Sequence, residues 1–192
     1  MTLATYVLVH GGAHGGWCYG PVARALRAAG HEVHTPTLTG VGDRSHLLRA
    51  DIAAPLMDAA RRDMREVDGI ELVLFPGTEP MPNYGVTEPD DIAWMSARLT
   101  PHPWKCFTQP LKLANEAALW EIPQSVICCT SNLAFRDPLR LQRARDAGRV
   151  WDIDTGHDLM ISEPDAVAEL LLRVAAAHHS EAQYGPPGES RH

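Results

Sequence analysis

The 192-residue sequence has few of the features that mark membrane, secreted or nucleic-acid-binding proteins. No apolar run reaches the ~18 residues that a membrane-spanning helix needs. The N-terminal residues show no basic segment followed by an apolar core and a cleavage site, so we expect a cytoplasmic protein. Acidic residues outnumber basic ones, 24 against 17, which argues against nucleic acid as a partner because phosphate binding depends on basic patches.

Cysteine is also scarce, and the spacings typical of metal sites are missing. The four cysteines, at positions 18, 106, 128 and 129, form no C-x-x-C pair. Cys128 and Cys129 are neighbours in an apolar run, and neighbours in a strand point to opposite faces, so we expect free thiols. The ten histidines show no ligand pattern such as H-E-x-x-H, so we predict no metal and no cofactor.

What the sequence does contain is the composition of a globular domain and an alternation of strands and helices. Hydrophobic residues make up 45% of the chain and charged residues 21%. Short runs rich in apolar residues predict strands at 3–10, 31–36, 70–75, 125–129 and 149–154. Helices are predicted at 21–29, 55–67, 90–99, 138–147 and 164–178. This order is typical of an α/β fold with a mostly parallel sheet flanked by helices.

The alternation is interrupted in the middle of the chain. Residues 51–120 are rich in charge, Pro and Gly, and we interpret them as a cap or lid inserted above the sheet. The core is then formed by residues 1–50 and 121–179, and residues 180–192 are expected to be a disordered tail.

Two loops carry residues that suit catalysis. The first is His10-Gly11-Gly12-Ala13-His14-Gly15-Gly16-Trp17, where glycines after a strand expose backbone N–H groups that can stabilise an oxyanion; a plain tight turn is the alternative. The second is Asp154-Thr155-Gly156-His157-Asp158, where His157 follows the last strand and is placed to act as a general base; a structural or solvated histidine is the alternative.

These segments together resemble the α/β-hydrolase family, and within it the small esterase and hydroxynitrile-lyase-like branch. The matching pieces, in family order, are VLVHGGAHGGWCYGPVARALRAAGHEV, TPTLTGVGDRSHL, GVTEPDDIAWMSARLTPHPWKCFTQPL, IPQSVICCTSNLAF and DIDTGHDLMISEPDAVAELLL. The resemblance implies a reduced α/β-hydrolase-like fold with a small cap. It implies an oxyanion hole at Gly11, Gly12 and Ala13, and His157 as the base of the triad. Asn132 falls near the position of the triad acid, and Asp137 is the alternative.

The sequence departs from the family at the nucleophile. No Ser, Cys or Asp lies in a G-x-S-x-G type of elbow, and the central strands that normally flank this elbow are missing with it. Omitting two strands would leave roughly 14 Å between the strand at 3–10 and that at 125–129. Three arrangements follow: the half-sheets pair directly, residues 70–75 replace the missing strands, or another copy of the chain fills the gap as a homo-oligomer.

Two functions remain open on this evidence. One is hydrolysis of a small ester or lactone without a cofactor, impaired because the nucleophile is missing. The other is a catalytically degenerate homologue that binds a small apolar ligand or a partner chain. The side chains predicted to contact a small molecule are those of His10, Trp17, Trp94 and Trp104, although core packing also explains the tryptophans. A deleted product without activity is a third interpretation.

Overall fold

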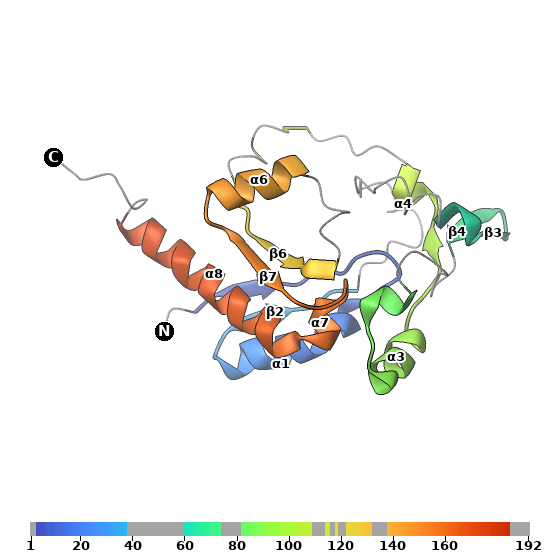
Figure 1. Cartoon of the computed structure of the whole chain (residues 1–192), viewed down its shortest axis with the longest axis horizontal. Coiled ribbons are helices and arrows are strands. Elements are labelled where there is room, and N and C mark those ends of the chain that lie inside the picture. The colour runs from blue at the N-terminus through green and yellow to red at the C-terminus, as the bar shows by residue number, and fades with distance from the viewer. Residues whose placement is uncertain are drawn as a thin grey trace.

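The computed structural model describes residues 3–37, 60–73, 82–108, 114–115, 118, 122–131 and 138–184. Within these residues the strands form two parallel pairs and one separate antiparallel sheet, with helices packed around them, which confirms the predicted α/β class (Figure 1). None of the described helices is long and apolar enough to cross a membrane.

The N-terminal half-sheet consists of β1 (Thr5–Val7) and β2 (Glu32–His34), which run parallel with Tyr6 opposite Val33. They are connected through the short helix η1 (Gly16–Tyr19) and helix α1 (Gly20–Ala28). Pro21 suits the first turn of α1, because proline has no N–H to leave unpaired there. The chain leaves the helix at Gly30, whose φ of +89° favours glycine.

The C-terminal half-sheet consists of β6 (Val126–Cys129) and β7 (Val150–Ile153), also parallel, with Cys128 opposite Asp152. Helix α6 (Pro138–Asp146) precedes β7 and contacts it. After β7 come α7 (Leu159–Ser162) and the long α8 (Pro164–Tyr184). All four cysteines are buried thiols outside any disulfide, as predicted.

Two of the three arrangements predicted for the sheet are wrong for the described strands. β1 pairs only with β2 and β6 only with β7, so the half-sheets do not join directly. Strand β4 (Ile70–Val73) does not replace the missing strands either, because β3 (Met64–Val67) and β5 (His102–Pro103) occupy its two edges. The third arrangement, in which a second copy of the chain fills the gap, stays a prediction. Val7 of β1 is 60% exposed.

The helix predicted over residues 55–67 is wrong at its C-terminal end, where Met64–Val67 is the strand β3. Asp68 and Gly69 have φ values of +51° and +78°, and two left-handed residues in succession form the tight turn of a hairpin. The Asp-Gly pair between two apolar segments was therefore the signal for a β3–β4 hairpin. Phe75, at the end of the strand predicted over 70–75, lies outside the described residues.

Other differences concern element ends. The 3-10 helix η3 (Pro82–Gly85) and helix α3 (Pro89–Ser96) come next in the chain. They are followed by β5 and helix α4 (Lys105–Thr108). Helix α8 continues to Tyr184, so the tail expected from Ser180 is helical over its first residues.

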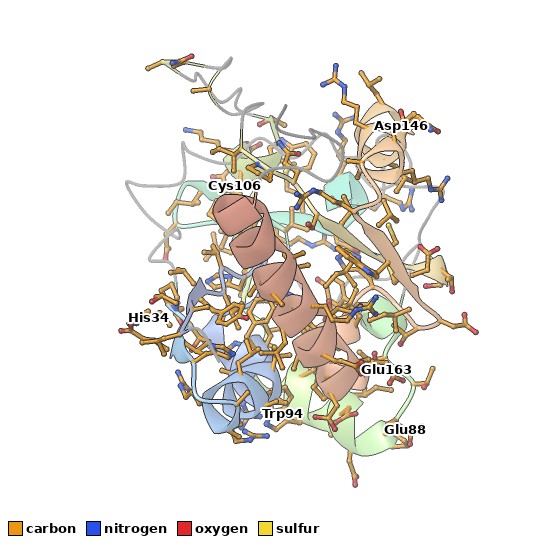
Figure 2. All side chains as sticks on the ribbon, turned by 90° about the vertical axis from the view of Figure 1, so that its left-hand side faces the viewer. His34, Glu88, Trp94, Cys106, Asp146 and Glu163 are labelled. Carbon is orange, nitrogen blue, oxygen red and sulfur yellow. The ribbon has the colours of Figure 1, made fainter. Side chains whose placement is uncertain are left out.

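The main core lies between α1, α8 and the first half-sheet. In Figure 1, α1 lies below α8, and β6, β7 and α6 lie above it. The buried members of this core are Leu8, Val22, Ala23, Leu26, Val33, Val167 and Ala168. Figure 2, in which α8 faces the viewer, shows His34 of β2 and Asp146 of α6 on opposite sides of this helix.

A second, smaller core brings distant segments together beneath the loops of interest. Its buried members are Cys18 of η1, Val86, Met95 of α3 and Ile161 of α7. Because these residues come from four separate segments, this core fixes the loop after β1 beside the loop after β7.

The main core predicts a large stability loss on truncation of Leu26. This side chain has no exposed surface, so Leu26→Ala should lower the free energy of unfolding by about 2–5 kcal/mol. The matched control is Leu139→Ala in α6, where the side chain is 60% exposed and the change should stay within about 0.5 kcal/mol. Urea unfolding followed by circular dichroism measures both; equal losses would contradict the assignment of the core.

Candidate functional site

The glycine loop after β1 is held by residues from the middle of the chain. Ala13 has a φ of +64°, which is unusual for a residue with a Cβ atom. Its carbonyl oxygen accepts a hydrogen bond from the Thr100 N–H at 3.0 Å, and its own N–H donates to Nδ1 of His102 at 3.4 Å. The N–H of Ala13, which was predicted to face an oxyanion, therefore faces a histidine ring.

The ring of His102 covers this part of the loop. A Cβ atom placed on Gly12 would lie 3.4 Å from Cδ2 of His102, which is close van der Waals contact. Burial lowers the pKa of His102, and the nearby His10 lowers it further. A neutral ring with an unprotonated Nδ1 can accept the bond from Ala13. Sequence reasoning missed His102, since no motif marks a histidine in the Thr-Pro-His-Pro segment.

A buried hydrogen-bonded pair joins the glycine loop to the loop that carries His157. Nε2 of His14 lies 2.8 Å from Oδ2 of Asp158, and the two residues are 8% and 1% exposed. On the other side of the ring, Nδ1 of His14 donates to the carbonyl oxygen of Gly12 at 2.8 Å. Burial by itself would lower the pKa of His14, but the hydrogen bond and negative charge of Asp158 outweigh it, and the pKa is raised.

Tyr84 and Gly85 of η3 complete this junction. The Asp158 N–H donates to the carbonyl oxygen of Tyr84 at 3.2 Å. The Tyr84 ring packs edge-on against His14, with centroids 5.2 Å apart, and lies 6.2 Å from the ring of His157. A Cβ atom on Gly85 would lie 2.7 Å from Cα of Gly156, so the two backbones touch at a point where only glycine fits.

His157 itself is exposed at this junction. The contacts through Tyr84 and through the pair of His14 and Asp158 bring its loop to the glycine loop. Asn132 and Asp137, the two predicted candidates for the triad acid, lie outside the described residues.

The Cys18 thiol and the hydroxyls of Ser131 and Ser162 come from segments beside these two loops, and each is either protonated or hydrogen-bonded. Cys18 is fully buried, and burial together with the charge of Asp158 raises the pKa of its thiol to about 12. It therefore stays protonated and is a poor nucleophile. The Ser131 hydroxyl donates to the Thr155 carbonyl oxygen at 2.8 Å, and the Ser162 hydroxyl lies 2.8 Å from that of Thr155.

The predicted ligand-contacting residues fall into two places. Trp17 stacks on His14 at 5.4 Å and meets Trp94 edge-on at 5.1 Å, so these two tryptophans line the junction. Trp104 is 8% exposed and lies beside the antiparallel sheet, where its backbone N–H donates to the Glu71 carbonyl oxygen. Cys106, two residues after Trp104 in the chain, lies well apart from Trp94 in Figure 2.

His10 lies at the start of the glycine loop. Its Nδ1 is 2.8 Å from the carbonyl oxygen of Gly11, and its charge acts on His102. Within the described part of the chain, no group of three His, Cys, Asp or Glu side chains is arranged to hold a metal ion.

Comparisons with solved structures identify the fold. Polyneuridine aldehyde esterase superposes with a TM-score of 0.61 at 15% sequence identity, covering 91% of this chain and 100% of the other. An extracellular alpha/beta-hydrolase from a Paenibacillus species superposes with a TM-score of 0.56 at 15% identity, covering 88% and 98%. The chain has a reduced α/β-hydrolase fold.

Sequence comparison links this α/β-hydrolase-fold chain to esterases over a shorter stretch. A carbendazim-hydrolyzing esterase of Nocardioides is 67% identical over 45 residues, which are 23% of this chain. The matched segment spans 19%, about a fifth, of that protein's own length. No family model matches the chain.

The close backbone contact between Gly85 and Gly156 predicts a steric effect. In Gly156→Ala the new methyl group would collide with the backbone of Gly85, which has no flexible side chain to move aside. We expect a loss of about 1–3 kcal/mol in the free energy of unfolding. Gly11→Ala is the control, because a Cβ atom there meets nothing within 4 Å. Thermal unfolding compares the two variants, and an unchanged melting temperature for Gly156→Ala would contradict this packing.

Proposed function

We propose that this α/β-hydrolase-fold chain hydrolyses small esters or lactones slowly and without a cofactor, with His157 as the general base. One observation carries the proposal: an exposed histidine is held beside a glycine-rich loop by a buried hydrogen-bonded pair. A base and a set of backbone N–H donors on adjacent loops are the parts that acyl transfer requires. The esterase relatives support the same chemistry.

The reaction is written as direct attack by water. His157 takes a proton from the water as its oxygen attacks the carbonyl carbon, and the electron pair of the C=O bond moves to the oxygen. Backbone N–H groups at Gly11, Gly12 and Ala13 stabilise that oxyanion. Collapse of the intermediate expels the alcohol oxygen, which takes the proton back from His157. For Ala13 to take part, the substrate oxygen has to replace His102 as the acceptor.

This route has a kinetic signature. Without a serine in an elbow, no acyl-enzyme forms, so hydrolysis is slow and shows no initial burst of product. Asn132 or Asp137 is assigned to orient the His157 ring; an asparagine there would hold the ring by a hydrogen bond without stabilising its positive charge.

Hydrolysis of p-nitrophenyl acetate tests the proposal. The wild type should exceed the buffer rate, and His157→Ala should reduce the enzymatic part by roughly 100-fold or to background, the range that a general base contributes. His34→Ala is the control, because the exposed ring of this histidine contacts Glu32, away from the two loops, and the rate of this variant should equal that of the wild type. Equal rates for His157→Ala and the wild type, or a stoichiometric burst, would reject the proposed mechanism.

A second function is favoured by the contact between Ala13 and His102. Because His102 already accepts from the Ala13 N–H, this donor is occupied when no ligand is bound, which favours a protein that binds a small apolar ligand without turnover. In this case 2-decanone, a ketone that imitates an apolar ester, should bind without turnover. His102→Ala should tighten binding by several-fold in calorimetric titration, because Ala13 becomes free to donate. Unchanged affinity would remove the support that this contact gives.

A further inference from the structure

The protons of the His14 ring can be counted from its two hydrogen bonds. Nδ1 faces the carbonyl oxygen of Gly12 at 2.8 Å, and a carbonyl oxygen only accepts, so Nδ1 must carry a proton. Nε2 faces a carboxylate oxygen of Asp158 at the same distance, and a second proton must lie between them. His14 and Asp158 therefore hold two protons in this geometry, which corresponds to an imidazolium beside a carboxylate.

The surroundings of the pair favour this charge state. Oδ1 of Asp158 is buried and has no hydrogen-bond partner within the described part of the chain, so its charge depends on His14 for compensation. The titratable side chains placed against the pair come from three directions: Cys18 and Tyr19 of η1, Tyr84 of η3, and His157. Burial, and to a lesser degree the negative charge of Asp158, raises the pKa values of Cys18, Tyr19 and Tyr84, so these three stay uncharged at neutral pH. His102 of β5, which contacts the same glycine loop, is neutral.

The pair also connects the two halves of the site. His14 is bonded to the backbone of Gly12, and Asp158 directly precedes α7 and follows His157. Loss of the second proton would leave the lone pair of Nε2 against the carboxylate, and both the bond and the charge attraction would be lost. The His157 loop would then no longer be fixed against the glycine loop.

We propose that His14 and Asp158 are positioning residues that hold His157 beside the glycine loop only while His14 is protonated. The proposal rests on the proposed function. It predicts a bell-shaped pH profile: the rate rises as His157 loses its proton and becomes a base, and falls at higher pH as His14 loses its own. Since the folded-state pKa of His14 is raised, the stabilisation by the pair is complete below the ordinary pKa of ~6.5 and is lost as pH rises through the raised value.

The kinetic test compares pH profiles of kcat and KM for p-nitrophenyl acetate, corrected for spontaneous hydrolysis. His14→Gln keeps a donor toward Asp158 but cannot titrate, so the alkaline limb should disappear while kcat falls about tenfold and KM stays within twofold. Asp158→Asn should lower kcat similarly. His34→Gln is the matched control at an exposed histidine–glutamate pair and should keep the wild-type profile. An alkaline limb that survives in His14→Gln overturns the proposal.

A spectroscopic test separates this proposal from the proposed function. In protein with ¹⁵N-labelled histidine rings, both nitrogens of His14 should keep imidazolium chemical shifts to a pH above the ordinary imidazole pKa of ~6.5, in the wild type and in His157→Ala. If His14 loses its Nε2 proton near the ordinary imidazole pKa, the proposed role of the His14–Asp158 pair is overturned even if hydrolysis is found. If His14 is an imidazolium but the protein hydrolyses nothing at any pH, the proposed function is rejected, and the positioning role is rejected with it. The charged state of the pair would still be correct.

Discussion

The buried hydrogen bond between His14 and Asp158 is the contact on which the arrangement of the site depends. It joins residues 144 positions apart and has both partners almost fully buried. Removing one partner of a buried pair leaves an uncompensated charge, and such changes cost about 3–5 kcal/mol in other proteins. Around this bond, the Tyr84 ring packs edge-on against His14 and the Tyr84 carbonyl oxygen accepts from the Asp158 N–H, so three segments meet at one point.

The reduced sheet explains why side-chain contacts carry so much of the organisation. In a continuous parallel sheet, ladder hydrogen bonds would fix the loop after β1 relative to the loop after β7. Here β1–β2 and β6–β7 are separate ladders among the described strands. The packing of Cys18, Met95 and Ile161, together with the pair of His14 and Asp158, takes over this task.

The same reduction changes the chemistry available to the fold. A His-bearing loop and a glycine loop remain adjacent, but the elbow that would present a serine is missing from the sequence. The segment from Thr100 to His102 lies on the glycine loop and bonds both polar atoms of the Ala13 backbone. A reduced α/β-hydrolase fold can therefore keep the histidine loop beside the glycine loop without a serine elbow, and the fold alone does not set the reaction.

Local sequence patterns determined much of the fold and two of the site's segments. The proline and glycine at the ends of α1, the apolar runs of β1, β6 and β7, and the stripe of Val167, Leu170 and Leu171 on α8 depend on periodicity and backbone preference, which are local properties. Gly11, Gly12 and His157 were found for the same reason, since each follows a recognisable strand. Asp68-Gly69 is also a local signal, typical of a hairpin turn, but the charged residues before it favoured the prediction of a helix.

Only the tertiary structure decided what these segments contact. No spacing in the sequence relates His14 to Asp158, or His102 to Ala13, because their encounter depends on how separate elements pack. The position of β4 was also decided by tertiary structure. A strand can pair along two edges, and β4 pairs with β3 along one and with β5 along the other. The sequence by itself therefore determined which two loops are candidates for the site, and long-range packing decided which side chains hold those loops together.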